Sequence, residues 1–258
     1  MFGMGMTLKL DEVKSVLKKP SFIFVTIFLQ FSIMPLLAIV ICLIFDFTKE
    51  ITLGFLILGA CPGGTASNVI AYICRANVSL SILSTFASTS LAIFLTPLLI
   101  YLLADQTILI DLSSLIKSTF LIIFLPVLCG FIFNSFLDRK KKILNFFPIF
   151  SEIIVALIIS IIFAVNFDNL VHISYKIVFG VTLHNLIGLI LAFKIAQILN
   201  YPEDVKKTVA IEVAMQNSGL GMTLALIHFS KIVALPSAIF SLWHNISAAG
   251  LVYLWKKK

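Results

Sequence analysis

The chain has few charged residues for its length. Only 12% of its 258 residues are charged, whereas 60% are hydrophobic, and the mean hydropathy is +1.11. Soluble proteins carry about 25% charged residues. This shortage excludes a soluble globular domain and predicts an all-α polytopic membrane protein that is surrounded by the lipid bilayer.

Cysteines and catalytic motifs are also scarce. The four cysteines lie in or beside apolar runs, without metal-ligand spacing or a disulfide framework, so we interpret them as small core residues. The sequence contains no His-Glu-x-x-His, Gly-x-Ser-x-Gly or paired intramembrane Asp motif, which argues against a membrane enzyme. Residues 1–19 are too charged to span a membrane and lack a cleavage site, so we expect a cytoplasmic segment and not a signal peptide.

Uncharged or weakly charged stretches predict eight membrane spans. They cover residues 20–45, 51–74, 76–104, 112–137, 148–167, 177–197, 208–229 and 232–255. An even number of spans places both termini on one side, and 15 of the 19 Lys and Arg residues fall in segments on that side. Positive residues favour the cytoplasm, so we expect a multi-pass protein of the plasma membrane with both termini inside. The same rule explains the net charge of +7 without a nucleic-acid partner.

The seventh span contains a polar interruption from Ile211 to Gly221. Glu212 is the only acid placed well inside a long apolar run, and it is followed by Gln216, Asn217, Ser218 and two glycines. A carboxylate at membrane depth costs on the order of 3 kcal/mol or more unless it finds a partner. Short polar residues and glycines also predict an interrupted helix, whose freed backbone groups must line a cavity or be buried in protein. The pattern favours an ion or substrate site, and the alternative is a polar kink sealed by a neighbouring helix.

The second span is interrupted in a similar way. Pro62, Gly63 and Gly64 break the helix, and Thr65, Ser67 and Asn68 place polar atoms at the break. In the third span, Ser81 and Thr85 are four residues apart and share one helix face. Such hydroxyls often only bond back to the preceding turn. His184 and Asn185 in the sixth span are interpreted as packed core groups.

The two interruptions occupy matching places. The first three and the last three spans each have a broken middle span, and the two triplets enter the membrane from opposite sides. That arrangement is the signature of an inverted-repeat secondary transporter whose site lies where the two breaks meet, near the middle of the membrane.

Three segments, at residues 62–68, 212–219 and 236–245, resemble the bile acid:sodium symporter family. The resemblance covers essentially the whole chain and implies sodium-coupled symport of an organic anion, either bile acid-like or another small organic acid. It also implies a core domain with two crossing broken helices and a smaller panel domain. Sodium would be transported together with the anion and would not be a prosthetic group.

The resemblance also implies the residues of the sites. One sodium site would use Ser67, Asn68, Ser81, Thr85 and Glu212, and a second would use Gln30, Glu212, Gln216 and carbonyls near Val213 and Met215. The substrate would contact Thr65, Asn68, Asn217, Ser218, His244 and Asn245. Oxygen-rich cages of this kind suit hard cations.

One departure from the family concerns the start of the chain. A Met-Phe-Gly-Met-Gly-like stretch ends the family's second helix, whereas here it is residues 1–5, so two panel helices are expected to be missing. Residues 1–258 then form one transporter domain, with core helices at about 20–104 and 174–255 and a partial panel at about 112–167. The alternatives are a misassigned start, a truncated gene or pairing with another copy of the chain. They also include a non-transporting remnant, a membrane receptor, or an enzyme that uses Glu212 or His244 as acid or base.

Overall fold

The computed structural model describes residues 2, 5, 20–136, 146–165 and 175–256. Within these residues the secondary structure is helical apart from one isolated antiparallel bridge. The principal helices are α3 (Pro20–Phe45), α4 (Lys49–Gly59), α5 (Ala66–Ile73), α6 (Val78–Leu103), α7 (Leu112–Phe136), α8 (Phe146–Val165), α10 (Tyr175–Ile198), α11 (Glu203–Ala214), α12 (Ser218–His228) and α13 (Leu235–Lys256).

Both predicted helix breaks are present. The second span is divided into α4 and α5, and the seventh into α11 and α12. The second break lies slightly earlier than the residues Asn217 to Gly219 on which the sequence placed it, because α12 already begins at Ser218. The side chain of Asn217 accepts a hydrogen bond from the backbone N–H of Leu220 at 3.1 Å and so caps the new helix. Gly219 therefore belongs to α12 and not to the break.

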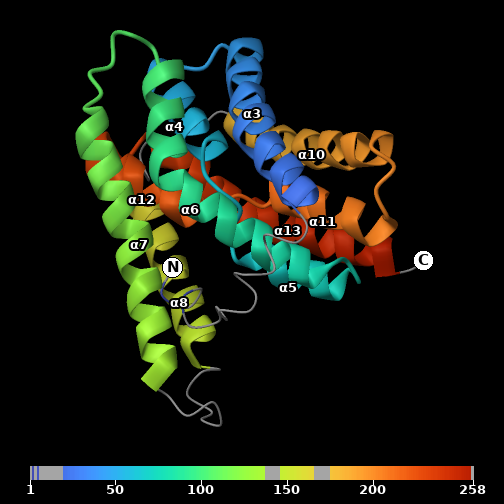
Figure 1. Ribbon diagram of the computed structural model, residues 1–258. Coiled ribbons are helices and arrows are strands. Elements are labelled where there is room, and N and C mark those ends of the chain that lie inside the picture. Colours follow the sequence, from blue (N-terminus) through green and yellow to red (C-terminus); the bar gives the residue numbers. More distant parts are fainter. Residues whose placement is uncertain (1, 3–4, 6–19, 137–145, 166–174, 257–258) are drawn as a thin grey trace.

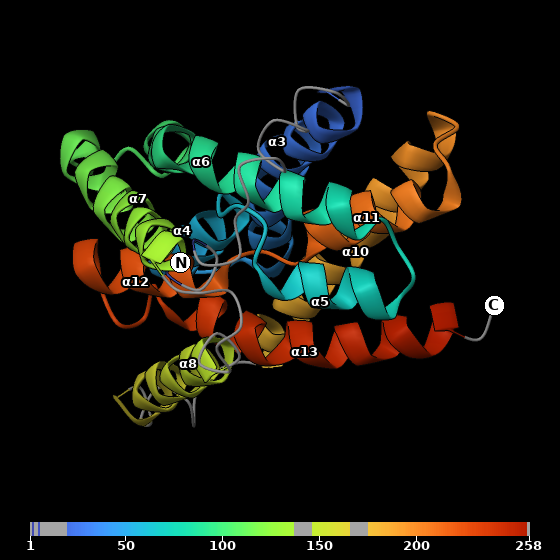
Figure 2. The same cartoon turned by 60° about the horizontal axis from the view of Figure 1, so that its bottom comes forward.

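The two triplets pack against each other to form the centre of the protein. α3 contacts α4, α6, α10 and α11, and α10 contacts α11 and α13. α7 packs on α6 and α12 at one side of this group, and α8 packs on α13 (Figure 1). Figure 2 shows α5 lying alongside α13, with α8 on the other side of α13. The fold is thus an all-α inverted repeat, while the division into core and panel domains remains a prediction.

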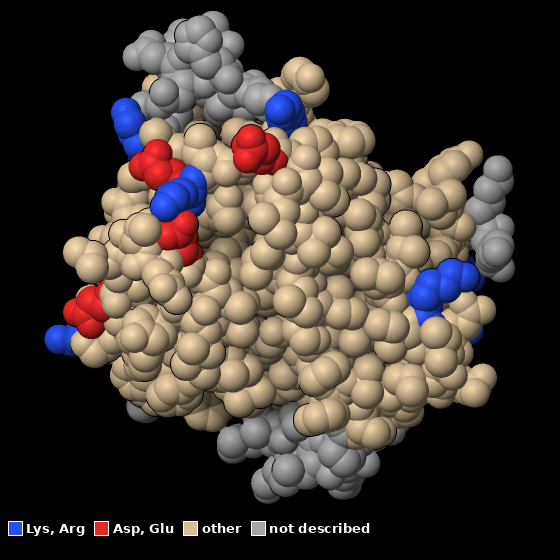
Figure 3. Space-filling view, turned by 90° about the horizontal axis from the view of Figure 1, so that it is seen from above, with Lys and Arg blue, Asp and Glu red and all other residues tan. Residues whose placement is uncertain are grey.

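The outer surface is suited to lipid. Charged side chains gather in a few clusters in Figure 3, with wide uncharged surface between them. Large apolar side chains such as Leu43 and Ile44 are more than 70% exposed. Among the residues that the structure describes, four helical segments are each long and apolar enough to cross a membrane, namely Ser21–Phe45, Val78–Leu103, Leu112–Phe133 and Tyr175–Ile198. The chain is a polytopic membrane protein, while the count of eight spans and their orientation remain predictions.

Candidate ion and substrate site

The two helix breaks cross and pair with each other. Gly63 and Gln216 form an antiparallel bridge. The N–H of Gly64 donates to the carbonyl of Met215 at 2.7 Å, and the N–H of Asn217 donates to the carbonyl of Pro62 at 2.8 Å. Each break therefore satisfies backbone groups that the other leaves free, which explains how unwound backbone is tolerated at membrane depth. The predicted crossing of the broken helices is confirmed.

The close approach at the crossing depends on glycine. A Cβ atom at Gly63 would lie 3.0 Å from Glu212 Oε2 and 3.4 Å from the Glu212 backbone oxygen. A Cβ atom at Gly64 would lie 3.3 Å from the Gln216 backbone oxygen. The two glycines thus allow the α4–α5 break to pass directly over the end of α11.

Glu212 points into this crossing and is surrounded by hydroxyl groups. The residue is only 2% exposed. Its Oε1 accepts hydrogen bonds from Ser67 Oγ of α5 at 2.5 Å and from Ser81 Oγ of α6. Its Oε2 accepts a hydrogen bond from Thr85 Oγ1 of α6 at 2.7 Å. Among the residues that the structure describes, Glu212 has hydroxyl partners and no ion pair.

When the Glu212 carboxyl is ionised, this cluster holds more acceptor oxygens than protons. Asn68 Oδ1 lies 2.8 Å from Ser81 Oγ and 3.3 Å from Thr85 Oγ1, and Ser67 Oγ lies 2.7 Å from the Gly64 carbonyl oxygen. Each hydroxyl carries one proton, so the three hydroxyls cannot donate to the carboxylate and to these other oxygens at the same time. A cation bound among them would satisfy the acceptors that remain.

The structure therefore gathers every residue of the first expected sodium site. They come from three helices, and they are Ser67, Asn68, Ser81, Thr85 and Glu212. The described residues contain no group of three or more His, Cys, Asp or Glu side chains that could hold a metal ion. One carboxylate among neutral oxygens gives a cage of hard ligands with a single negative charge. Such a cage balances one monovalent cation.

The glutamines of the second expected sodium site meet at the end of α4. Gln30 Nε2 donates to the Cys61 carbonyl at 2.7 Å, and Gln216 Nε2 donates to the Gly59 carbonyl at 2.8 Å. Gln30 Oε1 is buried and has no hydrogen-bond donor among the described residues. Both side chains are thus ordered by freed carbonyls of the α4 end, and the Gln30 oxygen remains open to a further partner. Among the described residues, neither the Gln30 amide nor the Gln216 amide is hydrogen-bonded to the Glu212 carboxylate.

The backbone members of that second site lie at the end of α11. Val213 and Met215 are both buried, and Met215 is the residue that caps the C-terminus of α11. The Met215 carbonyl accepts the hydrogen bond from Gly64 across the crossing. Its second lone pair is the one that a cation would use.

Of the six expected substrate residues, Asn68 lies in the hydroxyl cluster around Glu212, and the other five fall into two groups. Thr65 and Asn217 are the residues before the first turns of α5 and α12, and Ser218 is the first residue of α12. Helix N-termini favour negative charge, so this first group is suited to an anion. His244 and Asn245 instead bond back within α13, to the carbonyls of Phe240 at 3.0 Å and Ser241 at 2.8 Å. The structure does not bring this second pair into hydrogen-bond contact with the crossing.

Three residues that contact the breaks were not expected from the sequence. Asn185 Nδ2 donates to the Ala214 carbonyl at 2.9 Å, and Thr96 Oγ1 donates to the Ala60 carbonyl at 2.6 Å. His184 Nε2 lies 3.0 Å from Gln216 Oε1. These side chains provide hydrogen-bond partners for residues at or just after the ends of α4 and α11. The only signal in the sequence is a polar residue in an intact neighbouring span, which is too common to identify a contact.

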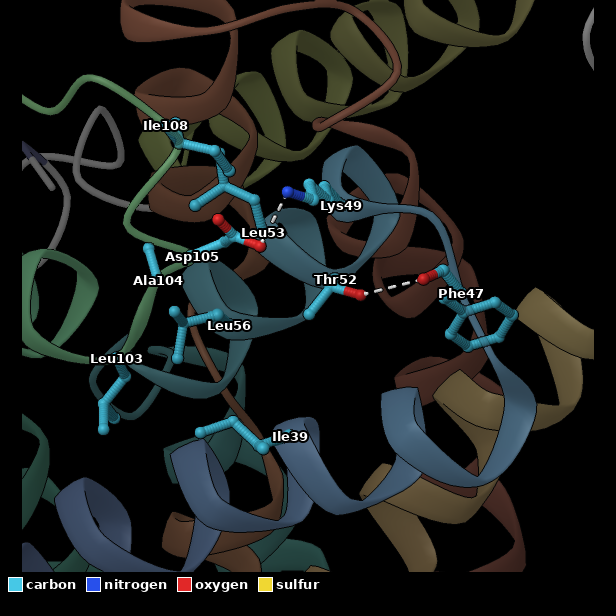
Figure 4. Close-up of a pocket in the computed structure, with 10 residues that line it drawn as sticks. All are labelled: Ile39, Phe47, Lys49, Thr52, Leu53, Leu56, Leu103, Ala104, Asp105 and Ile108. Atoms are coloured by element: carbon cyan, nitrogen blue, oxygen red, sulfur yellow. Dashed lines mark hydrogen bonds and ion pairs between the residues drawn. The ribbon is translucent and has the colours of Figure 1, made fainter.

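A surface pocket of ≈ 190 Å³ lies elsewhere, between α4, the end of α6 and the segment that follows it (Figure 4). Lys49 Nζ lies 3.0 Å from Asp105 Oδ2 and donates to Thr107 Oγ1 at 2.9 Å. Hydrogen bonds from Thr107, and then from Lys49, lower the pKa of Asp105 to about 2, so this carboxyl group stays ionised at neutral pH. None of the expected site residues lines the pocket, and it is distinct from the crossing.

Two crossing half-helix pairs around a buried carboxylate define the class of inverted-repeat secondary transporters. Comparison with known sequences gives the family. The sequence model of the sodium bile acid symporter family matches residues 1–173, and the chain belongs to that family. Because the family consists of transporters, the reading as an enzyme is excluded.

Relatives from bacteria, plants and animals share this family. The chain is 40% identical over 259 residues to an uncharacterized sodium-dependent transporter of Bacillus subtilis (YocS) and covers 81% of its length. It is 36% identical over 261 residues to the probable sodium/metabolite cotransporter BASS1 of Arabidopsis thaliana chloroplasts. It is 30% identical over 268 residues to the human ileal sodium/bile acid cotransporter. The alignments include all of this chain, which spans 65% of the plant protein and 77% of the human one.

Proposed function

We propose that this protein is a sodium-coupled symporter of an organic anion. The observation that carries the proposal is the buried Glu212 carboxylate, which lies among three hydroxyls and the Asn68 oxygen with too few protons for all the acceptors. The names of the relatives support the same function, because they describe sodium-dependent transporters and cotransporters.

Sodium is the ion that we assign to the crossing. A carboxylate buried at membrane depth without a cationic partner is costly, and a bound cation removes that cost. Glu212 serves both sites in this proposal: Ser67, Asn68, Ser81 and Thr85 complete the first, and Gln30, Gln216 and the carbonyls near Val213 and Met215 complete the second. Sharing one carboxylate makes the two sites interdependent.

The substrate that we assign is a small organic acid or a bile acid-like anion. Two helix N-termini converge on the crossing, and Thr65, Asn217 and Ser218 lie at them. An acid group placed between them would receive backbone N–H groups and the positive ends of two helix dipoles. Asn68, His244 and Asn245 would supply further contacts. Bound sodium would add positive charge beside the same anion, which would couple the two binding events.

We further propose how the chain is placed in the membrane. It would be a multi-pass protein of the plasma membrane, with both termini in the cytoplasm, in agreement with the distribution of Lys and Arg. α3–α6 and α10–α13 would form the core that carries the ions, and α7 and α8 would form a panel against which the core moves. A second copy of the chain would pack against that panel.

Uptake into proteoliposomes tests the transport function. Liposomes containing the purified full chain would be offered radiolabelled organic anions, from small carboxylic acids to a bile acid, under an inward sodium gradient. We expect uptake of at least one anion with sodium outside, none when potassium replaces sodium, and none with Glu212→Ala. Stabilisation by sodium without uptake of any anion would instead support a receptor or a non-transporting member of the family.

A further inference from the structure

His184 is a buried titratable residue of α10 that the proposed function leaves unused. It is 0% exposed, and its Nε2 lies 3.0 Å from Gln216 Oε1 at the second break. The imidazole packs nearly edge-to-face against Phe55 and Phe240, with ring centroids 6.5 and 6.4 Å away. Both phenylalanines are completely buried, so the ring is held in place from two sides.

The hydrogen bonds of Gln216 determine which nitrogen of His184 carries the proton. The Gln216 Nε2 donates to the Gly59 carbonyl at 2.8 Å, and a carbonyl oxygen can only accept. The amide is therefore oriented with Oε1 toward His184, and His184 Nε2 must be the donor. His184 Nδ1 is then an acceptor, and it has no hydrogen-bond donor among the described residues.

The neighbouring residue fixes the backbone at the same break. Asn185 Nδ2 donates to the Ala214 carbonyl at 2.9 Å, and Asn185 Oδ1 accepts from Trp243 Nε1 at 3.2 Å. Two consecutive residues of α10 thus hold two positions of the break, one through the main chain at Ala214 and one through the side chain at Gln216. This arrangement orders the break in advance of any ligand.

We propose that His184 is a positioning residue for the sodium site that contains Gln216. The proposal rests on the sodium-coupled function given above. An amide oxygen has two lone pairs, and His184 occupies one of them, so the other is left for a cation. If the donor were lost, the Gly59 carbonyl alone would hold the Gln216 amide, and the amide oxygen would be less firmly placed for a cation. His184 would thus act through Gln216 and would not contact the ion itself.

Sodium titration of thermal stability tests this role without requiring transport. The purified full chain would be melted at increasing sodium chloride, with choline chloride keeping the ionic strength constant, because a ligand of the folded state raises its stability. His184→Phe keeps a flat ring of similar size but has no donor. We expect the sodium concentration for half-maximal stabilisation to rise about tenfold, the lower end of the effect seen when partners of metal ligands are removed.

Two variants separate hydrogen bonding from packing. In His184→Gln an amide N–H can reach the position of the imidazole Nε2–H, so we expect the sodium response to return toward that of the wild type. In His184→Asn the shorter amide ends before Gln216, so we expect the weakened response of His184→Phe. If His184→Phe fails to fold, the comparison of Asn with Gln alone decides the proposal. A wild-type sodium response in both His184→Phe and His184→Asn would overturn it.

Controls distinguish failure of this proposal from failure of the proposed function. His228→Phe makes the same change at the last residue of α12, ten residues or about 15 Å beyond the break, and should leave the sodium response unchanged. If sodium does not stabilise even the wild type, the assignment of sodium to the crossing is wrong. If sodium stabilises the wild type but not Glu212→Ala, and His184→Phe matches the wild type, only the role of His184 is wrong.

Discussion

The hydroxyl of Ser67 donates to the carboxylate of Glu212 at 2.5 Å, although 145 positions separate the two residues in the chain. Ser67 belongs to the first triplet of helices and Glu212 to the second. Neither triplet has the cluster alone, because the first supplies hydroxyls without a carboxylate and the second supplies the carboxylate. The cluster therefore forms only where the two triplets cross. Variants in either triplet should change the stabilisation of the protein by sodium.

Replacing Glu212 should remove the response to sodium. Glu212→Ala leaves the hydroxyl cluster without a negative charge, so we expect no stabilisation by sodium in a thermal melt. A site saturated at 100 times its Kd contributes about 2.7 kcal/mol of stability, which would be lost. Glu212→Gln keeps an oxygen without the charge, and it should bind sodium better than Glu212→Ala if geometry dominates and equally poorly if charge dominates. A full sodium response in Glu212→Ala would show that the ion binds elsewhere.

Removing one hydroxyl at the carboxylate should have two effects. Ser81→Ala deletes a donor to an ionised group, so the free energy of unfolding without sodium should fall by about 1.5–3 kcal/mol. The same change removes a ligand, so more sodium should be needed for half-maximal stabilisation. Ser90→Ala is a matched control on α6, because Ser90 is exposed and bonds back to the Phe86 carbonyl at 2.9 Å. If Ser81→Ala and Ser90→Ala had the same free energy of unfolding in chemical denaturation, the hydrogen bond from Ser81 to Glu212 would contribute nothing to stability.

A methyl group at the crossing should disturb the carboxylate. Gly63→Ala places a carbon 3.0 Å from Glu212 Oε2, which must then move by a few tenths of an ångström. We expect a weaker sodium response in isothermal titration of the purified variant. Gly250→Ala is the control, because its Cβ would meet nothing within 4 Å and alanine favours a helix by about 0.8–1.0 kcal/mol over glycine. An unchanged sodium affinity in Gly63→Ala would mean that the carboxylate position matters little.

The orientation in the membrane can be tested with cysteine labelling. Cys129 is exposed and the other three native cysteines are buried, so Cys129→Ser supplies a suitable background. In that background, Lys141→Cys should react with a membrane-impermeant thiol reagent only after cells are permeabilised, and Lys49→Cys should react in intact cells. Position 141 lies outside the described residues, and its side of the membrane follows from the charge distribution alone. Labelling of position 141 in intact cells would show that the orientation is the opposite of the one proposed.

Much of the fold could be predicted from the sequence because membrane helices are determined locally. The first expected span, residues 20–45, coincides with α3, and the expected break at Pro62 and Gly63 separates α4 from α5. Hydropathy and helix-breaking residues act within a few positions, so they are visible without knowledge of tertiary structure. The sequence alone showed that Ser67 and Asn68 lie at a break and that Ser81 and Thr85 share one helix face, whereas their grouping into a sodium site came from the resemblance to the family.

The remaining contacts depend on how distant helices pack. The pairing of Gly63 with Gln216 requires the register of two breaks that are far apart in sequence. The orientation of Gln216 depends on the Gly59 carbonyl and on His184, which come from two other helices. His184 was interpreted as a packed core group, and no local pattern distinguishes a core histidine from one that holds a ligand residue. The contact between His184 and Gln216 is visible only in the three-dimensional arrangement.

The long separation between Ser67 and Glu212 also has a consequence for biosynthesis. A ribosome completes α5 and α6 well before it reaches α11. The hydroxyls of Ser67, Ser81 and Thr85 therefore enter the membrane before the Glu212 carboxylate has been synthesised. The proposed sodium site would be complete only when the last triplet has been inserted, so sodium would not assist the insertion of these early helices. Sodium in the growth medium should therefore raise the yield of full-length variants that fold poorly, and it should leave chains that stop before α11 unchanged.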